Sequence, residues 1–307
     1  MNLLQIAQLE RELVHYNMLK HEKQYAFPSG SVSPNRVAIV GSCGHLFIGE
    51  GSNNWIAQLD GSTAASSESY EPWIDLFNSR SANADDLSVK ICNLIVPEKQ
   101  IVLYNFFGHE QPPLSWNNRP VKRILNCLPN DIEVIYPAAA MISRQSWAEL
   151  YWRGNSHWCA SGCLTTVELI LKNFGVHFDA DAVSLKRHAT RHDLQVHLMD
   201  DLVDEEVLQI STIGTFSEVK RPYASTGSHS GSQYVIRNPA AEVNSTLVIF
   251  GDSYSYDAGL TYALSAFFTE VRFLWSKNVN WDYIRDHKAK FVIWESAERF
   301  LSSIPSS

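Results

Sequence analysis

The chain has 307 residues, of which 45% are hydrophobic and 19% are charged, and its formal net charge is −8. This balance is typical of globular proteins and excludes a disordered or collagen-like chain. The excess of acidic residues argues against a nucleic-acid-binding protein, because such proteins usually present a basic face. The five cysteines are an odd number, so we expect free thiols in a reducing compartment and no disulfide framework.

The N-terminus predicts an amphipathic helix. Apolar residues recur at helical spacing between residues 3 and 16, and Glu10, Arg11 and Glu12 are expected on the exposed side. The helix can pack on the domain or on a partner, including a second copy of the chain. The segment has no basic region before an apolar run, which argues against a signal peptide, and no stretch approaches the roughly 18 apolar residues of a membrane span. We therefore expect a cytoplasmic protein.

From residue 36 on, short β-rich runs alternate with helical patterns. Strands without polar alternation imply a parallel sheet buried on both faces, so the predicted fold is a three-layer α/β domain. It spans residues 36–307 and follows an N-terminal helix and linker in residues 1–35. The small polar segment 223–232 is expected to be a mobile loop. The predicted β-rich runs are 37–40, 45–48, 100–106, 132–136, 246–250, 271–275 and 291–294, and the predicted helices are 121–128, 161–173, 256–268 and 281–287.

The first chemical signal is Gly251-Asp252-Ser253, directly after the apolar run 246–250 and before a predicted helix. Ligands of open α/β sheets bind at the carboxyl ends of the strands, which is where Ser253 would lie. Gly251 would permit a tight turn, and the helix N-terminus would favour negative charge on an attacked carbonyl. An ordinary helix cap made by the Asp or the Ser is the alternative.

The second signal is Asn155-Ser156-His157-Trp158. A serine nucleophile needs a base within hydrogen-bond reach, and that base needs an acceptor that orients it. Residues two apart on an extended segment share one face, so Asn155 and His157 can act together. A packed structural histidine is the alternative.

Together these segments resemble the SGNH-hydrolase-like domain of the alginate O-acetyltransferase family, whose members modify bacterial exopolysaccharides. That family carries an Asp-Thr-His-Trp motif, followed later by a strand and Gly-Asp-Ser. The order is the same here, with His157 before Ser253, whereas most SGNH esterases place the serine first. The resemblance covers about residues 36–302, with weaker matches at 44–51, at Asp193-Leu194 and at 295–301.

The resemblance implies a serine-dependent O-acetyltransferase or O-acetyl esterase that acts on a carbohydrate or polysaccharide through an acyl-enzyme. Ser253 would be the nucleophile, His157 the base and Asn155 the residue that orients the base. Independently of the resemblance, Trp158 adjoins the proposed base and is the tryptophan best placed to contact a sugar ring, with core packing as the alternative. The implied partners are an acetyl donor and a carbohydrate acceptor, without a cofactor. The family generally acts outside the cytoplasmic membrane, in contrast to the location expected from the N-terminus.

Asn155 stands where the family has Asp. Its carbonyl can accept the Nδ1–H of His157 but cannot stabilise the imidazolium by charge, and a flipped amide would hold the wrong tautomer. A slow enzyme, a Ser–His dyad, or a carboxylate from elsewhere in the chain would each be consistent with this substitution. Asp257 is the nearest such carboxylate in sequence. A non-catalytic carbohydrate-binding or scaffold protein is the alternative function.

Two other clusters could be metal sites. His188 and His192 would share one face of a helix, but the arginines beside them would repel a cation, so we expect a solvated helix face. His157, Cys159 and Cys163 lack a fourth ligand at suitable spacing, and the two cysteines are expected to be buried near a helix start. No glycine segment has the context of a phosphate-binding loop, so no nucleotide cofactor or metal is expected.

Overall fold

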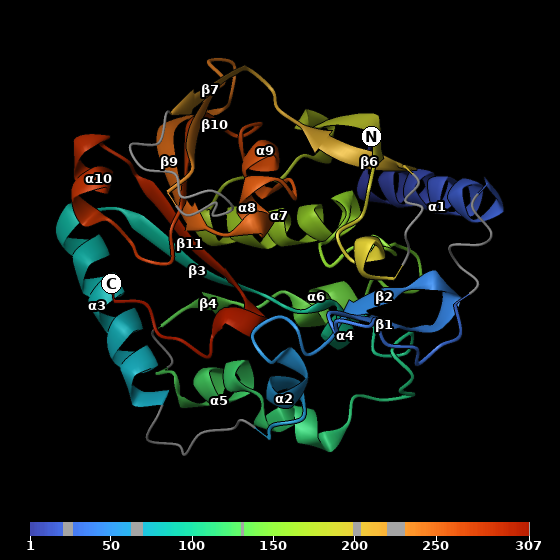
Figure 1. Ribbon diagram of the computed structural model, residues 1–307. Helices are drawn as coiled ribbons and strands as arrows, with labels where there is room; N and C mark the ends of the chain where they lie inside the picture. The colour runs from blue at the N-terminus through green and yellow to red at the C-terminus, as the bar shows by residue number, and fades with distance from the viewer. Residues whose placement is uncertain (21–26, 63–69, 130–131, 199–203, 220–230, 307) are drawn as a thin grey trace.

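The computed structural model describes residues 1–20, 27–62, 70–129, 132–198, 204–219 and 231–306 (Figure 1). The predicted mobile loop lies largely outside these residues. A seven-stranded sheet with the strand order β4-β3-β11-β9-β10-β8-β7 forms the centre of a mixed α/β fold. Neighbours from β4 to β10 are parallel, and β8 and β7 extend the sheet in antiparallel orientation. The strands are β3 (Lys90–Val96), β4 (Val134–Ile135), β7 (Thr215–Val219), β8 (Gln233–Arg237), β9 (Val243–Gly251), β10 (Phe268–Trp275) and β11 (Phe291–Ala297).

Both faces of the sheet are buried, as the unbroken apolar run in β9 predicts. Leu247 and Ile249 pack in one cluster with α7 (Ala160–Phe174) and α9 (Leu260–Leu264). Val248 and Phe250, which point to the opposite face, pack with α3 (Glu71–Leu87) and α10 (Trp281–Asp286). Figure 1 shows β11 and β3 running between these two groups of helices. The parallel strands therefore all end at one edge of the sheet, and the candidate nucleophile follows β9 at that edge.

Shorter elements surround the sheet. Two antiparallel pairs lie apart from it: β1 (Ala38–Val40) with β2 (Leu46–Ile48), and β5 (Ser184–Thr190) with β6 (Glu205–Ser211). Among the described residues, no helix combines the length and the apolar character that crossing a bilayer requires. The remaining α-helices are α1 (Leu3–Lys20), α2 (Trp55–Leu59), α4 (Lys99–Val102), α5 (Pro120–Cys127), α6 (Ala138–Ile142) and α8 (Ser253–Tyr256).

Three predicted elements differ from the structure. The β-rich run at 100–106 contains the helix α4, and His188 lies on strand β5 where we expected a helix. The predicted helix at 256–268 is divided into α8 and α9 at Gly259, whose φ of +99° is in the left-handed region. For the run at 100–106 the reason is that short buried helices and short buried strands have the same apolar pattern.

The N-terminal helix α1 belongs to the main core. Ile6, Ala7 and Leu13 pack in the same cluster as α7 and the sheet. Glu10, which we expected to be exposed, is only 4% exposed. Its carboxylate accepts the backbone N–H and the hydroxyl of Ser161 in the first turn of α7. The first N–H groups of a helix have no partner within it, so this contact explains why an acidic side chain turns inward.

The start of α7 corrects a further prediction. We expected Ser161 to cap the helix, but the N-cap is Cys159 and the Ser161 hydroxyl donates to Glu10. Cys159 and Cys163 are buried near the helix start, as predicted.

Burial raises the pKa of Glu10 to about 7 from 4.5, although hydrogen bonds from Ser161 lower it. The folded chain then keeps a proton on Glu10 that the unfolded chain has lost, so the free energy of unfolding should fall as the pH rises from 4.5 to 7. Glu10→Gln removes this dependence, and its stability relative to wild type should rise by up to about 3 kcal/mol across that range. Urea unfolding below pH 4.5 and above pH 7 measures the effect.

The control is Glu12→Gln, at an exposed position of the same helix. It should follow the wild type at every pH. Equal pH dependence in the wild type and Glu10→Gln would show that Glu10 does not hold this proton.

Candidate functional site

Ser253 begins a helix immediately after a central strand. The strand β9 ends at Gly251, Asp252 occupies the N-cap position, and Ser253 is the first residue of α8. Asp252 Oδ1 accepts the N–H of Tyr254 at 3.0 Å, so Asp252 caps the helix. The hydroxyl of Ser253 is therefore free of the capping role and is available to a base.

Residue 251 must be glycine because neighbouring side chains leave no space for a Cβ atom. A Cβ at this position would lie 2.5 Å from Glu295 Oε2 and 2.8 Å from Ser255 Oγ. The same Glu295 oxygen accepts the Asp252 N–H at 3.0 Å and the Ser255 hydroxyl at 2.7 Å. Burial and the charge of Asp252 raise the pKa of Glu295 well above its usual range. A neutral Glu295 can hold the turn without placing a second negative charge beside Asp252.

The histidine segment is fastened to the nucleophile turn by contacts on both sides of His157. The Tyr254 hydroxyl donates to the Ser156 carbonyl at 2.9 Å, and the Trp158 indole N–H donates to the Ala258 carbonyl at 2.7 Å. The rings of Trp158 and Tyr254 pack edge to face with centroids 4.8 Å apart. These contacts bring two distant parts of the chain together at the end of β9.

Ser253, His157 and Asn155 form a hydrogen-bonded chain. His157 Nε2 lies 2.7 Å from Ser253 Oγ, and His157 Nδ1 lies 2.8 Å from Asn155 Oδ1. Asn155 Oδ1 also accepts the backbone N–H of His157 at 2.9 Å. A backbone N–H can only donate, so the atom that it contacts must be the amide oxygen. The ring of His157 therefore carries its proton on Nδ1 and presents Nε2 as the acceptor for the Ser253 hydroxyl. The structure thus brings together all three residues that the sequence proposed as catalytic.

The amide of Asn155 is held from behind by a second histidine. Asn155 Nδ2 lies 3.4 Å from His192 Nδ1, and His192 Nε2 lies 3.1 Å from Glu205 Oε2. Because Nδ2 must donate, His192 Nδ1 accepts and the proton of its ring lies on Nε2, toward Glu205. His192 is 1% exposed, which corrects the prediction of a solvated helix face.

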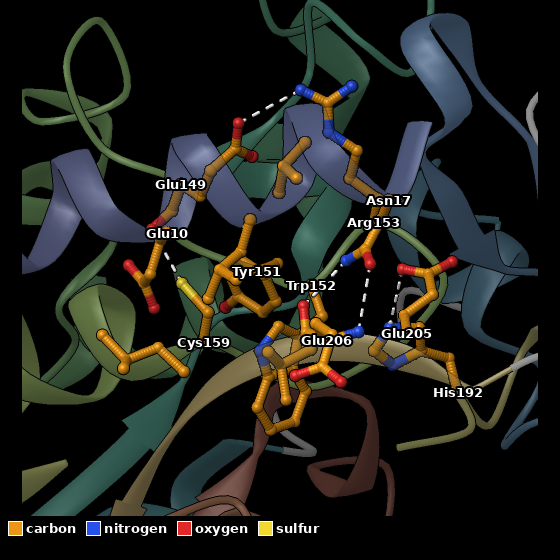
Figure 2. Close-up of a pocket in the computed structure, with 14 residues that line it drawn as sticks. Glu10, Asn17, Glu149, Tyr151, Trp152, Arg153, Cys159, His192, Glu205 and Glu206 are labelled. Carbon is orange, nitrogen blue, oxygen red and sulfur yellow. Dashed lines mark hydrogen bonds and ion pairs between the residues drawn. The ribbon is translucent and has the colours of Figure 1, made fainter. Parts of the chain in front are cut away.

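Figure 2 shows His192 and Glu205 together on the wall of a small pocket, near Trp152. Its volume of about 20 Å³ is enough for one water molecule. Neither Ser253 nor His157 lines this pocket. A substrate therefore has to approach Ser253 from elsewhere.

Asn155 has an amide and no carboxylate, but the carboxylate of another residue lies beside His157. Asp193 Oδ2 is 3.6 Å from His157 Nδ1. Its Oδ1 accepts the Ser156 N–H at 2.8 Å, and its Oδ2 accepts the Ser156 hydroxyl. The sequence suggested Asp257 as the nearest carboxylate, and the structure instead places Asp193 next to the imidazole.

The buried ammonium of Lys99 holds the segment that carries Asn155. Its Nζ lies 2.8, 2.6, 2.7 and 3.1 Å from the carbonyl oxygens of Leu46, Trp152, Arg153 and Asn155, which share its three N–H donors. Burial lowers the pKa of Lys99 to about 7, while nearby carboxylates act in the opposite direction. The contacts join β2, α4 and the Asn155 segment into one rigid support.

Trp158 takes the alternative role, that of a packed core residue. The side chain is fully buried, and its indole N–H is bound to the Ala258 carbonyl. The ring therefore has no open face for a sugar and supports His157 through packing. Among the described residues, no three His, Cys, Asp or Glu side chains converge to hold a metal ion.

Sequence reasoning missed three supporting residues. Lys99 reaches the Asn155 segment from the start of α4, His192 reaches it from a loop, and Glu205, at the start of β6, supports His192. His192 was considered only as a metal ligand. The Asp193-Leu194 match was the one signal that pointed to this part of the site.

No protein-family model and no curated protein matches the sequence. The fold is nevertheless similar to solved structures. Bacillus cereus PatB1 with a sulfonyl adduct is 15% identical, with a TM-score of 0.56 over 78% of this chain and 92% of that chain. A DHHW family protein from Eubacterium siraeum is 14% identical, with a TM-score of 0.56 over 90% and 96%. The O-acetyltransferase domain of Pseudomonas putida AlgJ is 15% identical, with a TM-score of 0.52 over 86% and 92%. At these identities the likeness shows a shared fold.

His192→Ala should slow the labelling of Ser253 by a fluorophosphonate about tenfold, because the Asn155 amide loses the acceptor that fixes its orientation. His192→Asn should retain most of the rate, since its side-chain oxygen can accept where Nδ1 lies. Labelling rates followed by intact-protein mass spectrometry measure both.

His188→Ala, on an exposed position of β5, is the control and should label like the wild type. Equal rates for His192→Ala and wild type would show that the amide needs no partner. Thermal unfolding of each variant separates a loss of orientation from a loss of fold.

Proposed function

We propose that the chain is an SGNH-hydrolase-like O-acyl-transfer enzyme that moves an acetyl group to or from a carbohydrate hydroxyl through a Ser253 acyl-enzyme. The observation that carries the proposal is the hydrogen-bonded chain from Ser253 through His157 to Asn155, with distances of 2.7 and 2.8 Å. A serine, a base and an orienting acceptor in this order are the parts that an acyl-transfer nucleophile requires. We include in this proposal that the chain has the three-layer arrangement of SGNH-like folds.

The geometry supports a specific order of steps. As Ser253 Oγ forms a bond to the acetyl carbonyl carbon, its proton passes to His157 Nε2. The tetrahedral intermediate collapses when the bond to the leaving oxygen breaks and Nε2 returns the proton to that oxygen. A second hydroxyl then gives its proton to Nε2 as it attacks the acyl-enzyme. The second tetrahedral intermediate collapses when the bond between Ser253 Oγ and the acyl carbon breaks, and Nε2 returns the proton to Oγ, which regenerates the free serine. If that second hydroxyl belongs to water the reaction is hydrolysis, and if it belongs to a sugar the reaction is transfer.

The start of α8 can stabilise the negative oxygen of the intermediate. Within the part of the chain that the structure describes, the backbone N–H of Ser253 has no acceptor. This N–H precedes the capped donor of Tyr254 and lies next to the attacking oxygen. A donor so placed strengthens its interaction as charge develops on the carbonyl oxygen.

The substrate class rests on likeness. The sequence motifs resemble a family that acetylates exopolysaccharides, and one structure with a similar fold is described as an O-acetyltransferase domain. We therefore propose an acetyl ester as donor and a carbohydrate as acceptor. The cytoplasmic location expected from the sequence stays a prediction.

Ser253→Ala should lower kcat/KM for an aryl acetate by about a thousandfold or more while the chain stays folded, because the nucleophile is lost. His157→Ala should cost a similar factor, and the double variant should be no worse than either single variant, because a nucleophile and its base act as one unit. Release of the phenol measured by absorbance gives these rates. Adding a soluble acetyl-accepting glycan and detecting O-acetyl sugar by mass spectrometry separates transfer from hydrolysis.

The substitution of Asp by Asn155 favours one other function, a carbohydrate-binding protein that kept the fold.

Undiminished activity in Ser253→Ala would contradict the proposed mechanism. A wild-type chain that cleaves no acetyl ester but binds glycans would support the binding protein instead.

A further inference from the structure

We propose that Asp193 carries the negative charge that stabilises protonated His157, while the neutral Asn155 only orients the ring. This assignment rests on the proposed acyl transfer. It divides between two residues the work that a single carboxylate performs in a Ser-His-Asp triad. Asp193 Oδ2 lies 3.6 Å from His157 Nδ1, close enough for charge interaction, while Asn155 Oδ1 makes the shorter contact of 2.8 Å.

The position of Asp193 is fixed by hydrogen bonds to the segment that carries Asn155 and His157. Both of its carboxylate oxygens accept from Ser156, which lies between Asn155 and His157. The next residue, Leu194, donates its backbone N–H to the Gly154 carbonyl at 3.2 Å. These bonds hold the carboxylate against the base even though its side chain is 41% exposed. The charge is therefore placed in advance of the reaction and does not depend on a mobile side chain.

The charge matters at one moment in the reaction. When Ser253 attacks, its proton moves to Nε2 and the ring of His157 becomes positive, with both ring protons in place. Asn155 Oδ1 continues to accept the Nδ1–H but adds no charge, whereas Asp193 attracts the imidazolium. Because solvent reaches Asp193, we expect an effect of about tenfold on the rate and less than that of a buried triad acid.

The other charged groups nearby do not replace Asp193. Glu205 is separated from His157 by the ring of His192 and by the amide of Asn155. Lys99 donates to the Asn155 carbonyl, and when it is protonated it opposes a positive charge on His157. Asp193 interacts favourably with protonated Lys99. The carboxylate thus offsets the charge of protonated His157 and, when Lys99 carries a proton, that of Lys99.

Asp193→Asn keeps the size of the side chain and an oxygen that can accept the Ser156 N–H, but its amide NH2 replaces the oxygen that accepts the Ser156 hydroxyl, and the charge is removed. It should lower kcat/KM for an aryl acetate about tenfold, and its activity should fall off at a different pH from wild type on the acid side. Asp204→Asn is the matched control, because Asp204 is 53% exposed and pairs with Arg191 on the surface. The control should behave as wild type.

Moving the charge back distinguishes its electrostatic role from a structural one. Asn155→Asp in the Asp193→Asn background puts a carboxylate directly on Nδ1, and it should restore at least the lost tenfold. A purely structural Asp193 would not be rescued by a charge at residue 155. Wild-type kcat/KM in Asp193→Asn, or no rescue in the double variant, would overturn the assignment.

A readout without substrate separates this proposal from the proposed function. The proton NMR signal of the His157 ring, assigned with His157→Gln, should change with pH at a lower midpoint in Asp193→Asn than in wild type, because the imidazolium loses its anionic neighbour. Asp204→Asn should leave the midpoint in place. An unchanged midpoint in Asp193→Asn contradicts the role of Asp193, whether or not the chain turns over esters. A lowered midpoint in a chain without acyl-transfer activity supports the charge pairing and contradicts only the proposed function.

Discussion

The hydrogen bond between His157 Nε2 and Ser253 Oγ, 2.7 Å long, joins residues that are 96 positions apart, and the surrounding structure keeps its two ends in place. On one side, the parallel sheet delivers Ser253 at the end of β9, where Asp252 caps the following helix and frees the hydroxyl. On the other side, the ammonium of Lys99 binds the backbone from which Asn155 and His157 extend. Chemistry at Ser253 depends on both supports.

The presence of an amide in place of a carboxylate changes what the rest of the site must do. A carboxylate has two equivalent oxygens, so it orients a histidine in either flip, whereas an amide does so only when its oxygen faces the ring. His192, buried and bound to Glu205, accepts from Asn155 Nδ2 and so selects that flip. The missing charge is a separate need, and Asp193 lies where it can meet it. In this chain, Asn155 orients the His157 ring and Asp193 supplies the negative charge beside it.

Local patterns in the sequence were enough to predict the α/β class and to choose Ser253, His157 and Asn155. An apolar run before Gly-Asp-Ser defines a strand followed by a helix. The spacing of two paired Asn155 with His157 on an expected extended segment. The structure has bends at residues 155–157 instead, and Asn155 Oδ1 meets His157 at both its backbone N–H and Nδ1. The same patterns could not predict the inward-facing Glu10, because its partner is the start of α7, far away in sequence. They also missed Lys99, since a lysine next to a strand has the pattern of a surface residue until the carbonyls around it are known.

The most direct test of the account is to identify the residue that a small sulfonyl fluoride modifies in the folded chain. A sulfonyl group reacts with an activated serine, and the account predicts one adduct, on Ser253, found by peptide mass spectrometry. The adduct should form far more slowly in His157→Ala, because the hydroxyl then lacks the base that lies 2.7 Å away. A chain that takes no adduct at Ser253, or takes it equally fast without His157, would contradict the claim that these two residues form a working nucleophile.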